Sequence, residues 1–220
     1  MLEDYRSSFS EAYEHVFTTM REKLQLHPTG RPTKSTGSII EKLHRESIRL
    51  TQIQDIAGCR VVGTDVAEQD RVVRSLGSCF PEASIVDRRP NPSHGYRAVH
   101  VIVPVSGRRI EIQVRSTLQH LWAEFSERLA DELGSELKYG GGDELFRRAL
   151  TNISTTVADF EGIEAMARDF SRHEIPDDQT LRSKVQSFIQ SAATLREQVF
   201  KLLNDAIRAV DDAAREVKKR

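Results

Sequence analysis

Apolar and polar residues alternate most regularly in two neighbouring segments, 98–105 and 108–116. Each segment has valine or isoleucine at every second position, a pattern that predicts a strand with one buried face. Ser106 and Gly107 lie between the segments and are typical of a two-residue hairpin turn. The sequence therefore predicts a β-hairpin with one apolar face and one polar face.

A two-residue turn also predicts how the two strands pair. Val101 then lies opposite Ile112, so that both strands bury their apolar residues on the same side. The same register places His100 opposite Gln113 on the other side. Five side chains are predicted on or near this polar side: Tyr96, His100, Glu111, Gln113 and Arg115. They include a carboxylate for a metal or a proton, donors for phosphate and an aromatic ring for a base. An ordinary solvated face is the alternative interpretation.

Apolar residues at helical spacing predict six helices around these strands. Their expected ranges are 5–24, 38–50, 68–78, 118–129, 145 to a point before Pro176, and 181–217. Two further strands are predicted at 56–62 and 84–88. This mixture favours a sheet with helices against it, and we expect the helix at 118–129 to pack on that sheet. The last two helices need a partner surface, so we expect them to pair with each other and with the first domain, or with another chain.

Composition and charge narrow the classes of function. A chain of 220 residues fits at most two domains. Its 32 basic and 33 acidic residues leave a net charge of -1, which gives no whole-chain argument for nucleic acid or an anionic membrane. Cys59 and Cys79 lack the spacing of a metal site or a disulfide framework, which favours a reducing compartment. Because no signal core and no membrane-spanning apolar run occur, we expect a cytoplasmic protein without a membrane partner.

The predicted helix at 38–50 carries a cationic stripe. Its members follow the spacing i, i+4, i+7 and i+11, and they are Ser38, Lys42, Arg45 and Arg49. Such a stripe suits a polyphosphate, whereas a solvated face with local ion pairs is the alternative. Arg31 and Lys34 precede the helix and add positive charge near its amino-terminal dipole, where an anion is favoured.

Asp55 comes directly before the predicted strand at 56–62, where a carboxylate stays accessible to water and can bind a cation. A turn or cap carboxylate is the alternative interpretation. Asp55 and Glu111, combined with several lysines and arginines, are the groups that Mg²⁺-assisted transfer of a phosphorylated group requires. The reason is that the phosphate charge must be neutralised from both sides.

Four ordered strings resemble the RelA/SpoT alarmone synthetase domain. They are KSTGSIIEKLHR at 34–45, DIAGCR at 55–60, HGYRAVH at 94–100 and EIQVRS at 111–116, followed by Trp122 and Ala123. Their order and spacing make the resemblance specific, and it spans roughly the first two thirds of the chain. It implies an α+β fold, in which a nucleotidyltransferase-like mixed sheet is flanked by helices. The implied domains are a synthetase domain at 1–142 and a C-terminal helical region at 143–220.

The resemblance also implies an ATP-dependent pyrophosphokinase that uses Mg²⁺, transfers pyrophosphate to the ribose 3′-hydroxyl of GDP or GTP, and releases AMP. Asp55 would bind the metal, and Glu111 would be the second metal ligand or the base for the 3′-hydroxyl proton. ATP and its phosphates would be held by Lys34, Lys42, Arg45 and Arg60. The stripe adds Ser38 to these candidates, and the charge before the helix adds Arg31. The acceptor would be bound by Tyr96, stacking on the base, and by His100, Gln113 and Arg115.

Several positions depart from the family pattern. Pro32 stands where an arginine is usual, His94 where asparagine is common, and Ser126 with Glu127 where a Glu-His pair is usual. With LKYGGG at 137–142, these features resemble the toxin branch of small alarmone synthetases, some of which pyrophosphorylate the 3′ end of tRNA. The chain is too short for the hydrolase domain of the long family members, so we expect synthesis without hydrolysis.

Three hypotheses therefore remain, with the free nucleotide preferred as acceptor. The alternatives are a toxin that modifies the tRNA CCA end, with an antitoxin as possible partner, and an inactive nucleotide-binding module. A tRNA substrate requires basic surface outside the pocket, for which the candidates are Arg108, Arg109, Arg147 and Arg148. The oligomeric state stays open.

Overall fold

The computed structural model describes residues 2–173 and 178–218. The chain divides into two compact units. The first comprises Met1–Thr64, Glu68–Pro90 and Ala98–Ser116, and the second comprises Asp65–Ala67, Asn91–Arg97 and Thr117–Arg220. The predicted domains, 1–142 and 143–220, were drawn from a family resemblance, whereas these units are defined by compactness. The predicted boundary at residue 142 therefore stays a prediction.

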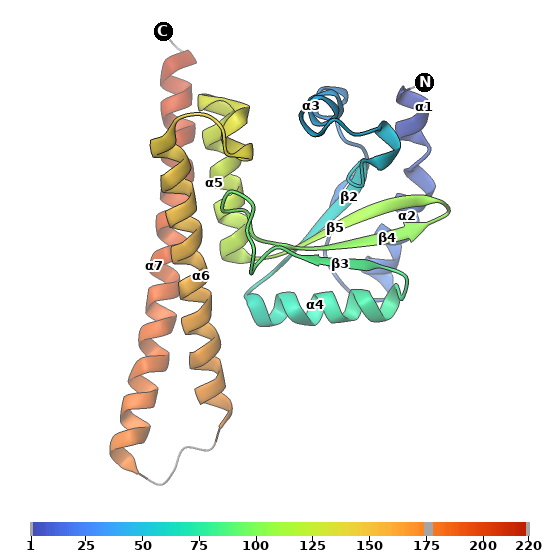
Figure 1. The fold of residues 1–220 in the computed structure, drawn as a ribbon. Helices are drawn as coiled ribbons and strands as arrows, with labels where there is room; N and C mark the ends of the chain where they lie inside the picture. The colour runs from blue at the N-terminus through green and yellow to red at the C-terminus, as the bar shows by residue number, and fades with distance from the viewer. Residues whose placement is uncertain (1, 174–177, 219–220) are drawn as a thin grey trace. The chain divides into compact units, whose positions relative to one another are not determined.

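The first unit is built on a five-stranded mixed sheet (Figure 1). Its strands are β1 (Thr29–Arg31), β2 (Ala57–Gly63), β3 (Ser84–Asp87), β4 (Val99–Val105) and β5 (Arg108–Ser116). Their order is β1-β2-β5-β4-β3, in which β2 and β5 run parallel while the other neighbours are antiparallel. The predicted α+β class with a mixed sheet is confirmed.

The hairpin of β4 and β5 has the predicted register. Val101 pairs with Ile112, and His100 pairs with Gln113. The two turn residues have positive φ angles of 48° and 74°. Two consecutive positive values are characteristic of a type I′ turn, whose twist matches that of the flanking strands. Local turn chemistry and apolar alternation therefore agree on one pairing.

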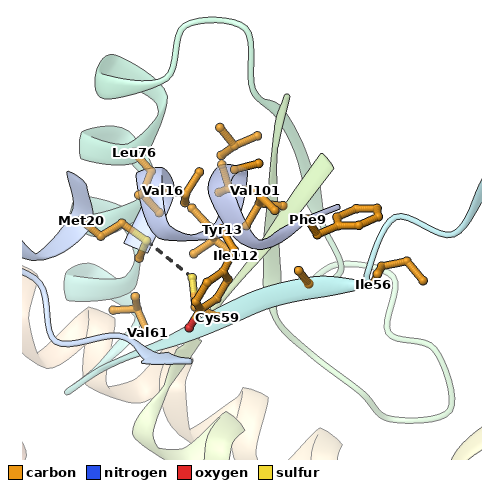
Figure 2. Close-up of a cluster of buried hydrophobic side chains, with 14 of the residues drawn as sticks. Phe9, Tyr13, Val16, Met20, Ile56, Cys59, Val61, Leu76, Val101 and Ile112 are labelled. Carbon is orange, nitrogen blue, oxygen red and sulfur yellow. Dashed lines mark hydrogen bonds between the residues drawn. The ribbon is translucent and has the colours of Figure 1, made fainter. Parts of the chain in front are cut away.

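The apolar face of the sheet is covered by α2 (Ser10–Glu22) and α4 (Val66–Cys79). Figure 2 shows the buried side chains of this core, which include Phe9, Tyr13, Val16, Met20, Cys59, Leu76, Val101 and Ile112. The Cys59 thiol donates to Sδ of Met20 over 3.6 Å. Burial, with a smaller effect of the Glu111 charge, raises the pKa of this thiol to about 12. Cys59 is therefore a protonated, unreactive core residue.

Two predicted helices differ from the structure. The helix expected at 5–24 is two helices, α1 (Leu2–Ser7) and α2, because the Ser8 hydroxyl bonds the Tyr5 carbonyl and competes with the helical pattern. The helix expected at 38–50 is α3 (Thr36–Glu46), which ends where Ser47 adopts a left-handed conformation with φ of 50°. Arg49 consequently does not belong to the α3 stripe; it precedes the short 3₁₀ helix η1 (Leu50–Gln52).

β1 was not predicted. The sequence at 27–37 indicated only an interruption between helices, yet Thr29–Arg31 pairs antiparallel with β2. A three-residue edge strand is too short to show an alternating pattern, so its existence depends on the neighbour that it pairs with.

The second unit is helical. It contains α5 (Thr117–Leu133), the 3₁₀ helix η2 (Ser135–Tyr139), α6 (Glu144–Arg172) and α7 (Gln179–Lys218). Pro176, predicted as the limit of the fifth helix, and the side chain of Val217 lie outside the described residues. Although α7 has 40 residues, no helix in the described parts is long and apolar enough to cross a bilayer.

The apolar stripe of α5 packs within this unit. Leu118 and Leu121 form one cluster with Val157 and Phe160 of α6, to which α7 adds Leu203 and its neighbour Ile207. We predicted the sheet as the partner of this stripe, and that prediction is wrong. An amphipathic stripe indicates that a partner surface exists without indicating which one. The prediction that the last two helices pair with each other is confirmed.

Candidate active site

The face of the sheet opposite the core is polar. Because side chains alternate along a strand, Cys59, Ile112 and Val101 point into the core while their neighbours point to the other side. On that side Arg60 of β2, Gln113 of β5 and His100 of β4 form one row across three strands. Neighbouring positions Glu111 and Arg115 lie on the same face.

Glu111 is held by a chain of hydrogen bonds. Nδ1 of His100 lies 2.8 Å from one carboxylate oxygen, and Nε2 of Gln113 donates to the other over 2.9 Å. Nη2 of Arg115 in turn donates to Oε1 of Gln113 over 3.0 Å, which fixes the orientation of that amide. The Glu111 residue is only 9% exposed. Burial alone raises the pKa of its carboxyl, but the bonds from His100 and Gln113 outweigh burial and lower it. Glu111 is therefore an ionised carboxylate at neutral pH.

Gly58 lies beside Glu111 in the register of β2 and β5. A Cβ atom at position 58 would come within 2.4 Å of the Glu111 carbonyl oxygen. Only glycine permits the two strands to approach so closely at this point. The glycine of the DIAGCR string thus has a structural reason, which is the placement of the Glu111 backbone.

Asp55 is held by two lysines. Nζ of Lys34 lies 2.5 Å from Oδ2, and Nζ of Lys42 lies 3.0 Å from Oδ1. The backbone places both partners, because the Lys34 amide donates to the Ile56 carbonyl and Lys42 stands on α3. Arg31 adds a bond to the Asp55 carbonyl oxygen over 3.2 Å. Burial raises the pKa of Asp55, but the two lysines outweigh it and lower the pKa to about 2.

The two carboxylates open into the same cleft. A cavity of about 780 Å³ is lined by Asp55 and Lys42 together with Glu111 and His100. The lining also includes Val86, Arg88, Ile102, Arg108 and Arg109. The sequence-based hypothesis required a shared cleft for Asp55 and Glu111. The structure brings them together although they are far apart in the chain.

The other predicted phosphate ligands lie in different surroundings. Ser38 receives a bond from the Ser35 hydroxyl within the first turn of α3. Nη2 of Arg45 lies 3.0 Å from the Glu46 carboxylate, and Arg45 is not among the residues lining the cleft. Arg60 lies on the polar face of β2 without lining the cleft. The predicted stripe therefore contributes one cleft residue, Lys42.

Tyr96 belongs to the second unit. Its ring is partly buried and packs on the cluster of Trp122, Ala123 and Leu150. Gly95, next to it, accepts a bond from the Ser154 hydroxyl. These contacts locate Tyr96 within its own unit, and its stacking role stays a prediction.

The four candidate arginines for tRNA are divided between the two units. Arg108 and Arg109 line the cleft of the first unit, and the Arg108 guanidinium lies 5.5 Å from the ring centre of Tyr5. Arg147 and Arg148 line a smaller cavity of about 320 Å³ in the second unit. His94 lines that cavity too, and its ring lies so close to Gly140 that a Cβ there would come within 2.3 Å.

Arg88 is a charged cleft residue that the sequence analysis did not identify. Nε of Arg88 is buried and has no hydrogen-bond partner among the described residues. The adjacent Arg89 is instead saturated, with bonds of 2.7 Å to both Asp87 and Asp70. The alternation of side chains along a strand could have distinguished the two arginines. Val86 pairs with His100, and position 88 lies on the same face as Val86, whereas position 89 lies on the other face. A partly buried guanidinium whose Nε has no partner indicates a site for an anion.

Residues 30–130 match the model of a family described as a region found in RelA/SpoT proteins. This chain carries a RelA/SpoT-type domain. The match includes both carboxylates of the cleft, and it begins within β1 and ends within α5.

The chain is also similar to uncharacterized relatives and to solved structures. Uncharacterized proteins of Mycobacterium tuberculosis and Mycobacterium bovis are 42% identical over 110 residues, which are 48% of this chain and 40% of theirs. The match thus spans less than half of those relatives. Small alarmone synthetase 1 from Bacillus subtilis has 22% identity and a TM-score of 0.58, with 76% of this chain and 96% of that one covered. A GTP pyrophosphokinase family protein from Streptococcus pneumoniae gives the same TM-score and identity, with 76% and 93% covered. The RelA/SpoT-type domain therefore has the fold of small alarmone synthetases.

Proposed function

We propose that this chain is an ATP-dependent pyrophosphokinase whose acceptor is the ribose 3′-hydroxyl of GDP or GTP. The observation that carries the proposal is the shared cleft, in which Asp55 with its partner Lys42 and Glu111 with its partner His100 line one cavity. In the reaction the acceptor O3′ forms a bond to the β-phosphorus of ATP. The bond from that phosphorus to the oxygen bridging to the α-phosphate breaks, and AMP leaves. The hydroxyl proton passes to a base, for which Glu111 is the candidate, and no covalent enzyme intermediate is needed.

The family and the fold support this choice of chemistry. A Bacillus subtilis small alarmone synthetase 1 whose structure holds its product pppGpp has 24% identity to this chain and a TM-score of 0.58. The bound pppGpp is a product of the Bacillus subtilis protein. By analogy, it suggests a guanosine nucleotide as the acceptor of this chain. Such a nucleotide bears anionic phosphates that the arginines of the cleft can bind.

On the donor side, the residues around Asp55 would bind ATP. Lys34, Lys42 and Arg31 now neutralise Asp55, and they would turn to the phosphates when ATP enters, because phosphate oxygens carry more charge than one carboxylate. Asp55 would then be available to a cation. Arg60 lies on the same sheet face and stays a candidate ligand, whereas Ser38 and Arg45 would first have to leave their partners on α3.

Mg²⁺ fits this pair of carboxylates. Among the described residues, no group of three or more His, Cys, Asp or Glu side chains is placed to hold a metal. Two carboxylates suffice for Mg²⁺, which keeps several waters and takes phosphate oxygens as further ligands. Bound there, it would neutralise charge on the phosphates of ATP. Asp55 and Glu111 would be its protein ligands, with Glu111 as the alternative base for the 3′-hydroxyl.

On the acceptor side, Glu111 would face the 3′-hydroxyl. His100 and Gln113 would keep its carboxylate ionised and oriented, and Arg115 would act through Gln113. Arg88 would bind the 5′-phosphates of the acceptor, which would satisfy its buried Nε. Tyr96 would stack on the base.

The test is incubation of the purified chain with ATP labelled at the β-phosphate, Mg²⁺ and one acceptor at a time. GDP, GTP and deacylated tRNA are the acceptors. Label on GDP or GTP, with AMP formed in equal amount, is the expected result. Label on tRNA alone would replace the free nucleotide with the CCA end, and label on none of them would favour the inactive nucleotide-binding module.

A further inference from the structure

Tyr96, the residue proposed to stack on the acceptor base, ends a tight turn in the second unit. The turn begins at Ser93, whose carbonyl accepts a hydrogen bond from the Tyr96 amide over 2.9 Å. His94 and Gly95 lie between them with φ angles of 52° and 88°, values characteristic of a type I′ turn. Because a positive φ is unfavourable for a residue with a Cβ atom, His94 keeps this conformation only while contacts around the turn hold it. The position of the Tyr96 ring therefore depends on what holds the turn.

One buried hydroxyl bonds the residues on both sides of Tyr96. The Ser154 hydroxyl of α6 donates to the Gly95 carbonyl over 2.5 Å, and it accepts from Nε of Arg97 over 3.1 Å. Ser154 is only 2% exposed, so water does not compete for these bonds. A hydroxyl can donate and accept at the same time, which an apolar side chain of similar size cannot do. Ser154 thus links the backbone before Tyr96 to the side chain after it.

The same face of α6 makes a second contact with the turn through Trp122. Leu150, one helical turn before Ser154, accepts a bond through its carbonyl from Nε1 of Trp122 over 2.9 Å. The Trp122 ring lies against Gly95, where an added Cβ atom would come within 2.7 Å of it. Position 95 therefore requires glycine both for its φ angle and for the close approach of this ring.

Arg147 extends this face of α6 by another helical turn. Its Nη1 donates to the Gly140 carbonyl over 3.0 Å. The Gly140 backbone in turn lies against the His94 ring, which would be within 2.3 Å of a Cβ atom at position 140. Because residues 147, 150 and 154 are three and four positions apart, they lie on one face of the helix. This face therefore supports both central residues of the turn, Gly95 directly and His94 through Gly140.

We propose that Ser154 is a positioning residue, which fixes the ring of Tyr96 and so sets the affinity for the acceptor base. It acts through its bonds to Gly95 and Arg97. The inference rests on the proposed function, in which Tyr96 stacks on that base. Stacking needs the ring in one orientation, and a turn that has lost its hydroxyl partner would sample several. Ser154 lies outside the family match at 30–130, so α6 contributes to acceptor binding from beyond the matched region.

The first experiment compares the steady-state kinetics of the wild-type chain and of Ser154→Ala. The substitution deprives the Gly95 carbonyl and the Arg97 guanidinium of this partner, which relaxes the turn. KM for GDP is expected to rise about tenfold, while KM for ATP and kcat stay near their wild-type values. A variant that is merely less stable would instead lose active enzyme, with both KM values unchanged. An unchanged KM for GDP would overturn the proposal.

Thr155→Ala is the matched control for the loss of a hydroxyl from α6. Thr155 follows Ser154 in the chain, and its hydroxyl donates to the Thr151 carbonyl of the same helix over 3.1 Å. Its removal leaves the turn untouched, so both KM values should stay near those of the wild type. A rise in KM for GDP as large as that of Ser154→Ala would indicate a general effect of the helix and contradict the proposal.

The second experiment measures hydrogen exchange of the backbone amides at 91–97 without nucleotide. Ser154→Ala is expected to accelerate exchange of the Tyr96 amide about tenfold, because this amide donates within the turn, whereas Thr155→Ala should not. Unchanged exchange in Ser154→Ala would overturn the role of the hydroxyl. A wild-type chain that used neither GDP nor GTP would overturn the proposed function and with it the acceptor role of Ser154. The exchange rates would still decide whether Ser154 holds the turn.

Discussion

The two faces of the sheet are made from alternate residues of the same strands, and they have opposite roles. Ile112 is fully buried against α2, whereas Glu111, its neighbour, is ionised and opens into the cleft. Burial of the apolar face stabilises the folded chain. The hydrogen bonds of the polar face instead fix the orientation of one carboxylate, at a cost in side-chain conformational entropy. Adjacent substitutions should therefore separate stability from activity.

The largest effect is expected at the carboxylates. Glu111→Gln and Asp55→Asn should each lower transfer at least about 1000-fold, about 4 kcal/mol in activation free energy, because each removes a negative charge without changing size. Initial rates with saturating ATP and Mg²⁺ measure this, and circular dichroism checks that the fold is kept. Turnover within tenfold of wild type in either variant would contradict the assignment.

On the apolar face, Ile112→Ala should lower the free energy of unfolding by about 2–5 kcal/mol, since it leaves a cavity in a filled core. The activity of the folded fraction should stay near that of wild type. Urea unfolding gives the free energy. Val86→Ala is the control on the cleft face, where an exposed valine contributes little, and an equal loss there would mean that the two faces do not differ.

At the contact between β2 and β5, Gly58→Ala should reduce activity about tenfold or more and cost about 1–3 kcal/mol of stability. The new methyl group would collide with the Glu111 carbonyl and displace the strand that bears the carboxylate. Gly37→Ala on α3 is the matched control, because in the described parts of the chain the added methyl group meets nothing within 4 Å besides its chain neighbours and its own helix backbone. Rates and unfolding curves of the two variants should diverge; similar values would show that Gly58 is not needed.

At the edge of the cleft, Arg88→Gln should raise KM for GDP about tenfold and leave KM for ATP near its wild-type value. Arg89→Gln should instead lower stability, since Arg89 binds Asp70 and Asp87 and does not line the cleft. Steady-state kinetics with each substrate varied in turn distinguishes the two. A rise in KM for ATP alone would place Arg88 with the donor.

The smallest effect concerns the two thiols. The pKa of Cys59 is raised to about 12, so thiolate stays scarce until the pH approaches that value, and the folded chain should not be alkylated there near neutral pH. Cys79 is partly exposed and should react. Intact mass after treatment with iodoacetamide should show one adduct on the native chain and two after unfolding. Two adducts on the native chain would mean that the core around Cys59 opens readily.

Part of the site was predictable because it depends on local rules. Alternation and a two-residue turn placed His100, Glu111 and Gln113 on one face of the hairpin, and the structure agrees. The stripe on α3 was less predictable. Its helix ends at Ser47, so Arg49 leaves the stripe, and Arg45 pairs with an acid on its own helix. Local ion pairs compete with a site for the same cation, and spacing alone does not decide between them.

The sequence by itself determined the hairpin, its register and the list of groups able to handle a phosphorylated substrate, because these follow from periodicity and residue chemistry. Only the tertiary structure decided that Asp55 and Glu111 share a cleft, that Arg88 faces it while Arg89 does not, and that α5 packs on α6 and α7. Each of these depends on which distant segments meet. A pattern along the chain specifies that a face must be covered or paired, and the competition among all such faces settles the partner.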